Sequence, residues 1–470
     1  RGIELLSGGT VISNDRVTLS GQDIVLDGRA SAKNLILVNG AGNISAGGTL
    51  QTTDRIALVA AGNLTLGAGG RLEVVGNARS TGLVSGTSSA ANIALAATGS
   101  LSNLGTIFSD GSVALFADIG NIANAGNITA QRDAVLESRL GGIDTTAGVI
   151  SASNIGILQN GTDFTNNGTL VAQGNLRISA LGISNSGLLG SNGALHLTAG
   201  VNGFQNFGGG TVFSATSVSI SSGIGSPSGT GIFSNNQASI ISIGDISIAG
   251  NDLFNSSGTI ESLAGNVNIQ ANNLTNQIAN LVIANDPTED RVLVSTGPAQ
   301  ISAAGDLSIT ALGIVTNSNS SLAAGGNITI TADTLNNVAT ALRQTGGGTL
   351  LLPPSIIADG LVTINANLFN NGSITPSGIF NGTGSVLPSV TIVPAVQVGG
   401  RGTYSSPGNP SGGDLPGGNT PSGAGSGGTP TNANLGGISI QSGGLLSTGG
   451  SSASGAGFLG TITPPNAGPN

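Results

Sequence analysis

The sequence predicts an all-β fold, a parallel β-helix of about 20 residues per coil, from three observations. The first is a recurring unit in which Gly and a polar residue precede apolar, polar and apolar residues, as in Gly305–Ile309 and Gly326–Ile330. Such a unit predicts a tight turn and then a short, half-buried strand. It also begins at Gly42, Gly62, Gly111, Gly174, Gly193, Gly244 and Gly265.

The second observation is the spacing of these units. Their glycines lie 19 to 21 residues apart in the pairs Gly42–Gly62, Gly174–Gly193 and Gly305–Gly326. This period leaves no room for a helix of about 10 residues beside the strands, which excludes helix-containing solenoids. A propeller blade would need about 40 residues and a Trp-Asp signature. The chain contains no Trp, so a coil of a parallel β-helix fits best.

The third observation is a second unit, in which an apolar residue, Asn, Gly and another apolar residue follow one another. It occurs at Leu101–Ile107, Phe164–Leu170, Ile183–Leu189, Phe254–Ile260 and Phe369–Ile374. This order predicts strand, turn and strand, so each coil should hold two or three short strands. Because Asn accepts turn conformations and can bond to the next coil, the turn asparagines are interpreted as structural ladders. They are Asn43, Asn63, Asn127, Asn175, Asn266 and Asn327.

The composition is compatible with a packed core and excludes several classes of protein. Of 470 residues, 80 are Gly, 38% are apolar and 7% are charged, which is too apolar and too regular for disorder. The glycines have no three-residue period, so a collagen is excluded. The 13 Lys and Arg residues argue against nucleic acid as a partner. No apolar run reaches the roughly 18 residues of a membrane helix, and without Cys there are no disulfides.

Shifts in composition divide the chain into four segments. Residues 1–33 are expected to form the N-terminal end coils with a charged, solvated surface, and a charged recognition site is the alternative. Residues 34–393 are expected to form the repeat domain. Residues 394–437, dense in Gly, Pro and Ser, are expected to be a linker, and residues 438–470 a tail able to dock on a β-edge.

The repeat is interrupted at four segments that are expected to be loops, namely Gly76–Ala91, Ser221–Gly231, Ala284–Pro298 and Val338–Pro354. Insertions in a solenoid can form binding surfaces, although tolerated decoration is the favoured interpretation. In the third loop, Asp286, Glu289 and Asp290 could bind Ca²⁺ through carboxylate oxygens. They lack the ligand spacing of an EF-hand, so a solvated loop is favoured, and no metal or cofactor is predicted.

No constellation of catalytic residues is predicted. His196 is the only histidine, and its alternation with Leu195 and Leu197 predicts that the imidazole faces solvent. A β-helical polysaccharide lyase or hydrolase is the alternative function, and it would need paired carboxylates from adjacent coils. The acidic candidates, which share no phase of the repeat as a group of three, are Glu137 beside Arg139, Asp144, Asp163, Asp245, Asp252 and Glu261.

The two alternating units resemble the repeats of filamentous haemagglutinin-type exoproteins, the large adhesins of bacterial two-partner secretion systems. The likeness covers residues 34–393 and is one of composition and period. It implies a right-handed parallel β-helix, export through an outer-membrane pore, and a fibrous role at the cell surface in adhesion or biofilm. The Asn-Pro-Asn motifs typical of the family's secretion domain are absent, and the family's repeat defines no binding residue.

We therefore expect a secreted structural or adhesive protein without enzymatic activity. Arg1 is followed directly by repeat-like sequence, as expected of a mature or excised fragment. Because a stack of coils has two β-edges, end-to-end association into a fibre is expected, with the Ile438–Ile462 tail laid on a neighbour's edge. The resemblance adds two further expected partners, a receptor or glycan on another cell and the export pore.

Overall fold

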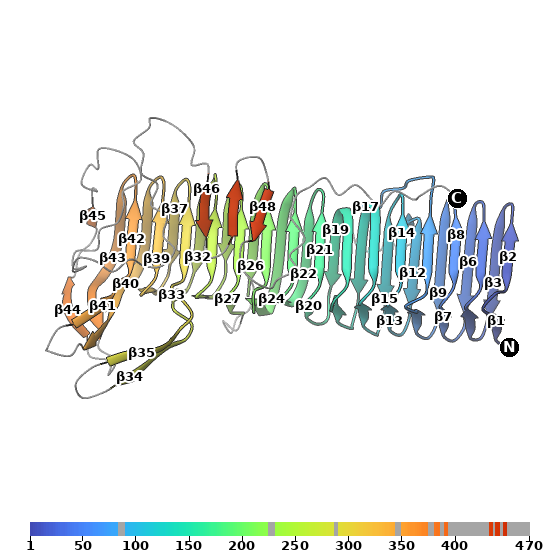
Figure 1. Ribbon diagram of the computed structural model, residues 1–470, viewed down its shortest axis with the longest axis horizontal. Coiled ribbons are helices and arrows are strands. Elements are labelled where there is room, and N and C mark those ends of the chain that lie inside the picture. Colours follow the sequence, from blue (N-terminus) through green and yellow to red (C-terminus); the bar gives the residue numbers. More distant parts are fainter. Residues whose placement is uncertain are drawn as a thin grey trace. The chain divides into compact units, whose positions relative to one another are not determined.

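The computed structural model describes residues 1–82, 90–223, 231–285, 290–343, 349–374, 380–385 and 390–392, and three strands between residues 432 and 448. The chain divides into two units, Arg1–Pro394 and Ala395–Asn470. In the described parts of the first unit all regular elements are strands, and they form a parallel β-helix of about 15 coils with about 21 residues in each (Figure 1). The predicted fold class is confirmed.

Each coil passes through three faces, and each strand pairs in parallel with its equivalents in the coils before and after. Ile24, for example, lies between Ile3 and Ile44. We number the faces in the order in which the chain meets them. Among the described strands, this pairing joins the backbone N–H and C=O groups of each inner coil to those of its neighbours, and open edges are left at the ends of the stack.

The first face contains β1 (Ile3–Leu5), β4 (Ile24–Leu26), β7 (Ile44–Ala46), β10 (Leu64–Leu66), β13 (Leu101–Asn103), β16 (Ile122–Asn124), β18 (Ile143–Asp144), β20 (Phe164–Asn166), β27 (Phe233–Asn236), β30 (Asp252–Ser256), β33 (Asn273–Gln277) and β38 (Ile314–Ser318). The second face contains β2 (Thr10–Ser13), β5 (Arg29–Ala32), β8 (Thr49–Thr52), β11 (Arg71–Val74), β14 (Thr106–Ser109), β21 (Thr169–Ala172), β23 (Leu188–Ser191), β25 (Thr211–Ser214), β28 (Ser239–Ser242), β31 (Thr259–Ser262), β36 (Gln300–Ala303), β39 (Ser321–Ala324) and β42 (Ser355–Ala358).

The third face contains β3 (Arg16–Gly21), β6 (Leu35–Gly40), β9 (Arg55–Ala60), β12 (Ile93–Ala97), β15 (Val113–Ala117), β26 (Ser217–Ser222), β29 (Ile246–Ala249), β32 (Val267–Ala271) and β37 (Leu307–Ala311). Longer strands turn a corner. Those running from the second face to the third are β17 (Asn127–Ser138) and β19 (Val149–Gln159). Those running from the third face to the first are β22 (Leu176–Asn185), β24 (Ala194–Phe207), β40 (Ile328–Arg343) and β43 (Val362–Ile374).

Alternation places the apolar residues of each strand inside the coil. In β7, Ile44 and Ala46 are buried while Ser45 between them is exposed. The inward residues of successive coils lie above one another and form one continuous hydrophobic core from Val17 to Ala366. A lone coil buries too few side chains to offset the conformational entropy of its residues, so each coil depends on its neighbours.

The Gly-Asn unit marks two different corners of the coil. At Gly62 it precedes the first-face strand β10, whereas from Gly111 onward it precedes third-face strands such as β40. Both corners bring the chain close to the preceding coil, and a Cβ at Gly326 would overlap Oδ1 of Asp306. The Asx side chain then binds the next coil, as Oδ1 of Asp306 accepts the backbone N–H of Asn327 at 2.7 Å.

Five of the six turn asparagines form the predicted ladders. In each case Oδ1 accepts a backbone N–H of the next coil at 2.8 to 3.0 Å, and these residues are Asn43, Asn63, Asn175, Asn266 and Asn327. The prediction is wrong for Asn127, which lies in β17 between Thr106 and Val149 of the adjacent coils. Its exposed side chain lies on the outer surface of a strand and not at a turn, so it does not receive an N–H of the next coil.

A longer ladder, which we did not predict, runs inside the core and ends at less buried positions, the half-buried Asn337 and the exposed Asn371. It occupies the inward position at the end of the first-face strands and comprises Asn103, Asn124, Asn166, Asn185, Asn206, Asn235, Asn255, Asn276, Asn317, Asn337 and Asn371. Between adjacent members Nδ2 donates to Oδ1 at 2.6 to 3.0 Å. Thr145 replaces Asn once, and its Oγ1 donates to Oδ1 of Asn166 at 2.6 Å.

The buried amides are satisfied on both sides. Nδ2 of Asn235 donates to Oδ1 of Asn255 at 2.9 Å and to the carbonyl of Ala238 at 3.2 Å, while its Oδ1 accepts from Asn206. A buried polar group is tolerated only with such partners. In the N-terminal coils the same position is apolar, as at Leu26 and Leu66. The ladder therefore starts at Asn103.

The insertions are more ordered than predicted. Two of the four expected loops contain β-hairpins, in which β34 (Leu281–Asn285) pairs antiparallel with β35 (Asp290–Ser295), and β41 (Thr349–Leu352) pairs antiparallel with the end of β40. The other two connect β11 to β12 and β26 to β27, and in them residues 83–89 and 224–230 lie outside the described residues. The continuous apolar run of Val292, Leu293 and Val294 was the strand signal that the loop prediction passed over.

The two ends of the coil stack differ. At the N-terminal end, Ile3, Leu5 and Leu19 are only half-buried, since no described strand pairs with the outer edge of β1, β2 or β3. At the other end, β44 (Phe380–Ser385) and β45 (Val390–Ile392) pair antiparallel with β43. The parallel stacking therefore ends on two of the three faces.

The second unit contains a three-stranded antiparallel sheet of β46 (Asn432–Leu435), β47 (Ile438–Gln441) and β48 (Leu445–Thr448). β46 falls within the segment expected to be a linker, and residues 394–431 of that segment lie outside the described residues. The tail residues 449–470 also lie outside them, so its expected docking on a β-edge stays a prediction.

Replacing one rung of the buried ladder should destabilise the stack. Asn235→Ala removes one of the two acceptors of Asn206 Nδ2 and the Nδ2 donor of Asn255 Oδ1, and it leaves a cavity, so we expect a loss of about 2 to 4 kcal/mol of unfolding free energy. Urea unfolding followed by circular dichroism measures it. Asn268→Ala removes an exposed Asn of β32 and should change stability by less than about 0.5 kcal/mol. Equal effects of the two substitutions would contradict the ladder's role.

Candidate functional site

The corner between the second and third faces carries polar residues along the N-terminal half of the stack. They immediately precede the third-face strands, and we call them the polar corner: Asp15, Asn34, Asp54, Asn92, Ser112, Asp133, Asn154 and Asn175. Short polar side chains suit this position because they can bond to backbone groups where the chain turns. They also join coils, as Nδ2 of Asn34 donates to Oδ1 of Asp15 at 2.9 Å.

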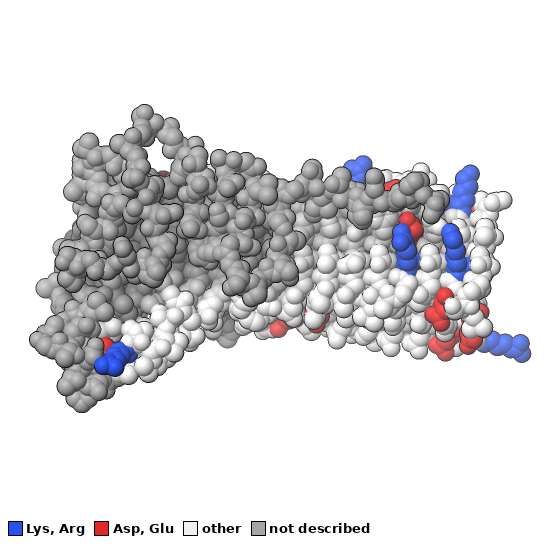
Figure 2. All heavy atoms as spheres, in the orientation of Figure 1, with Lys and Arg blue, Asp and Glu red and all other residues white. Residues whose placement is uncertain are grey.

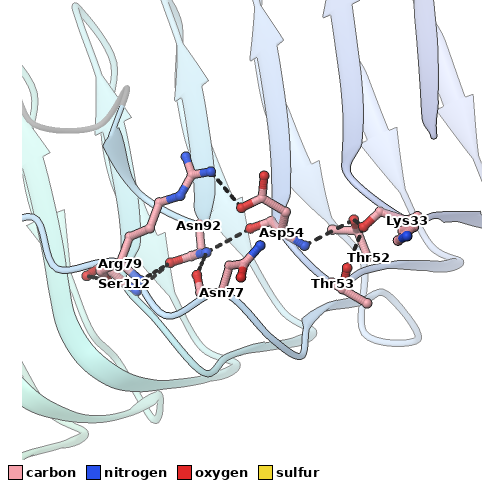
Figure 3. Close-up of polar contacts among 8 residues, drawn as sticks. All are labelled: Lys33, Thr52, Thr53, Asp54, Asn77, Arg79, Asn92 and Ser112. Carbon is pink, nitrogen blue, oxygen red and sulfur yellow. Dashed lines mark hydrogen bonds and ion pairs between the residues drawn. The ribbon is translucent and has the colours of Figure 1, made fainter.

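The segment Val75–Gly82, which we call the strap, follows β11 and is bonded to the polar corner (Figure 3). Asn92 fixes it with both ends of its amide. Nδ2 donates to the carbonyls of Asp54 and Asn77, each at 2.7 Å, and Oδ1 accepts the N–H of Arg79 at 2.9 Å. One side chain thus links a coil to the strap.

Arg79 holds the strap through an ion pair and a backbone contact. Its guanidinium lies 2.6 Å from Oδ1 of Asp54, and its carbonyl accepts the hydroxyl of Ser112 at 2.6 Å. A Cβ at Gly111 would overlap Oδ1 of Asn92, so the adjacent coil must have Gly there. Gly111 and Ser112 of the adjacent coil therefore both contribute to holding the strap at this corner.

The strap ends on the carboxylate of Asp133, which is only 2% exposed. Oδ2 of Asp133 accepts the hydroxyl of Ser80 at 2.5 Å and the N–H groups of Thr81 and Gly82 at 2.8 and 2.9 Å. Oδ1 accepts Nδ2 of Asn154 at 3.0 Å. Four donors therefore converge on one buried charge, which is the condition under which such a charge is tolerated.

These contacts lower the pKa of Asp133. Burial is the largest single effect and would raise the pKa, but the hydrogen bonds from Ser80, Asn154, Gly82 and Thr81 together outweigh it. The pKa consequently lies below its ordinary value of 3.8. Asp133 is a charged anchor for the strap at neutral pH.

Charged side chains of both signs gather on the same end of the stack, as Figure 2 shows for the N-terminal coils. Seven of the 13 Lys and Arg residues lie within the first 79 residues. Three of them have ion pairs, Arg16 with Asp15, Arg71 with Glu73, and Arg79 with Asp54. Within the described chain, Arg29, Lys33 and Arg55 have none.

Arg55 is a crowded cation. Its pKa is lowered mainly by burial and then by the positive charge of Arg79, and the nearby carboxylate of Asp54 only partly opposes them. Arg29 meets a neutral partner, since its guanidinium donates to Oε1 of Gln51 at 3.1 Å. The polar corner thus combines a fixed strap with Arg55, a cation that forms no ion pair in the described chain.

The other predicted site residues give no second candidate. His196 is exposed between Arg177 and Ser219 of the adjacent coils, as predicted. Asp286 and Glu289 lie outside the described residues, whereas Asp290 at the start of β35 is buried. In the parts of the chain that the structure describes, no three His, Cys, Asp or Glu side chains are grouped to hold a metal ion.

The carboxylates considered for an enzyme do not converge. Asp245 precedes a third-face strand, Asp252 lies on the first face and Glu261 on the second. Glu137 lies on the third face and Asp144 on the first. The carboxylate of Asp163 accepts Nδ2 of Asn202 at 2.8 Å, a contact between polar surface residues. Among the described residues, no three of these carboxylates are therefore grouped.

We did not predict the polar corner or the strap. The signal was present, since a short polar residue stands directly before most third-face strands in this half of the chain. This sequence signal is hard to recognise because the polar residue is Asp in some coils and Asn or Ser in others. The contact between Ser80 and Asp133 spans 53 positions of the sequence, so no local pattern reports it.

Comparisons with protein-family models, with curated proteins and with solved structures found no match to this chain. Among the described residues, no helix is long and apolar enough to span a membrane. The candidate site is accordingly argued from its own geometry.

Acid should release the strap. Because the pKa of Asp133 in the fold lies below 3.8, its stabilisation is complete above 3.8 and is lost as the pH falls through the folded-state value. Hydrogen exchange of the Thr81 and Gly82 amides, corrected for intrinsic rates, should therefore lose protection in this acid range. Asp133→Asn should exchange faster at neutral pH and lack the acid transition. A variant as well protected as the wild type at neutral pH would contradict the anchoring role.

Proposed function

We propose that this protein is a secreted structural or adhesive rod of the bacterial cell surface and that it is not an enzyme. The observation that carries the proposal is the stack of about 15 coils without a convergent group of catalytic side chains among the described residues. A fold of this kind gives length and a regular surface at low sequence complexity. The resemblance of residues 34–393 to filamentous haemagglutinin-type repeats supports the same role.

The partners in this proposal are an outer-membrane export pore, a receptor or glycan on another cell, and further copies of the chain. Self-association is proposed because the edge strands of a coil stack recruit other strands unless they are covered. The antiparallel strands β44 and β45 cover two faces of the last coil, so simple stacking of one rod on the next requires them to move. No specific observation favours the polysaccharide-active enzyme.

Surface display is tested on intact cells that produce the protein. An antibody against the coils should label unpermeabilised cells in immunogold microscopy, and an added protease should remove the label. A cytoplasmic protein probed in parallel should be labelled only after lysis. If this protein too were labelled only after lysis, the proposed location would be wrong.

The fibre is tested by removing the tail. If the tail lies on the edge of a neighbouring copy, deletion of residues 399–470 should abolish filaments seen by negative-stain microscopy, because unit Arg1–Pro394 keeps its coils but loses the pairing strand. Circular dichroism of the truncated chain checks that the β-helix persists. Unchanged filaments would remove the tail from the proposal.

A further inference from the structure

We propose that Asn160 is a site of covalent modification, at which the side-chain amide is converted to a carboxylate through a cyclic imide formed with the backbone of Gly161. The only reactant besides the chain is water, so the reaction requires no enzyme. The inference goes beyond the proposed function and does not depend on it. It starts from the Asn-Gly pairs of the chain, because a Gly without Cβ leaves its backbone nitrogen open to the preceding side chain.

The fold places the Asn-Gly pairs in two different settings. Those within strands begin at Asn39, Asn202, Asn371 and Asn381. Those in turns begin at Asn160, Asn167 and Asn192. Formation of the imide requires the side chain to rotate toward the next backbone nitrogen. The pairing of the sheet fixes the backbone of the strands, so the structure favours reaction at the pairs in turns.

The pair Asn167–Gly168 is held in place on both of its reacting groups. The N–H of Gly168 donates to Oδ1 of Asn166 at 3.3 Å. Oδ1 of Asn167 accepts the hydroxyl of Ser186 of the next coil at 2.6 Å. The backbone nitrogen and the side-chain amide must therefore each break a hydrogen bond before they can meet.

The pair Asn192–Gly193 is held in the same way by the preceding coil. The N–H of Gly193 donates to the carbonyl of Gly174 at 2.7 Å. Nδ2 of Asn192 donates to Oε1 of Gln173 at 3.1 Å. This turn therefore also keeps the nitrogen and the amide apart.

The pair Asn160–Gly161 lacks these restraints. Asn160 directly follows β19, at the corner between the third and the first face, and it is exposed. Within the described chain, neither its side-chain amide nor the N–H of Gly161 has a hydrogen-bond partner. The attacking nitrogen and the carbon that it attacks are thus neighbours in the sequence, and both are unbound.

The rest of this corner is fixed, so the reaction can occur in the folded protein. Gln159, only 3% exposed, precedes the pair. Its Oε1 accepts the N–H of Ile143 at 3.1 Å, and its Nε2 donates to the carbonyl of Asp163 at 2.8 Å. These bonds join both ends of the turn to the coil before it and leave residues 160 and 161 between them able to rearrange.

The reaction consumes water and releases ammonia. The backbone nitrogen of Gly161 attacks Cγ of Asn160, a C–N bond closes the ring, and Nδ2 leaves as ammonia with the proton of the N–H. Water then opens the imide. Cleavage at Cγ gives aspartate, whereas cleavage at the backbone carbonyl carbon gives isoaspartate, in which the chain runs through the side chain. Either product adds a negative charge to the turn that carries Asp163.

Trypsin releases the site and an internal control in one peptide. Cleavage after Arg139 and Arg177 gives residues 140–177, which contain both Asn160 and Asn167. The purified full chain is incubated at neutral pH and digested, and fragmentation in the mass spectrometer locates each converted amide against a sample taken at time zero. Conversion should be about tenfold faster at Asn160 than at Asn167, because no hydrogen bond has to break first.

The matched control is the same chain unfolded in urea, because both pairs have the sequence Asn-Gly-Thr. Without the fold, Asn160 and Asn167 should convert at similar rates. Asn160→Gln should remove the isoaspartate assigned to this site, because the longer side chain closes a larger ring that forms less readily. Equal rates at the two sites in the folded chain, no conversion at Asn160, or the same ratio of rates in urea would overturn the proposal.

Discussion

The constraint on which the structure depends is that each coil must pair, in register, with the coils on both sides. A single coil cannot fold, because its few buried side chains do not offset the entropy of its chain. Register is enforced at several levels: the backbone pairs residue with equivalent residue, apolar side chains stack in the core, and amides bond to amides. A shift by one residue would turn each buried amide toward solvent and bring outward polar side chains into the core.

The sequence was sufficient to predict the coil but not the corner of each motif. Gly followed by Asn or Asp is required wherever the chain passes close to the preceding coil and an Asx oxygen receives an N–H. That condition holds both before Leu64 and before Ile328, on different faces. Because both corners use the same Gly-Asx turn, the sequence does not show which of the two corners a given turn forms. The spacing of about 20 residues between turns is still predicted correctly, because each corner occurs once per coil.

The buried ladder and the strap were missed for different reasons. Asn103 alternates in phase with Leu101, which indicates an inward side chain, but an isolated buried amide is so costly that the turn interpretation took precedence. A buried amide is tolerated when it bonds to the amide at the same position of the next coil. Which residues stack in this way is known only from the folded structure. The strap depends on contacts such as Asn92 with Asn77 and Asp133 with Ser80, which have no periodic signature. Sequence periodicity therefore predicts the repeated strands of the coils better than the side-chain contacts and inserted segments.

The point at which the amide ladder begins gives the rod a mechanical polarity. From Asn103 onward, successive coils are joined by an amide chain in addition to their backbones, whereas the coils before it carry Leu26 and Leu66 at that position. Peeling a laddered coil from the stack breaks one amide rung in addition to the backbone bonds. Under tension along the chain, the N-terminal coils would peel away first and absorb extension, while the laddered coils would keep their length.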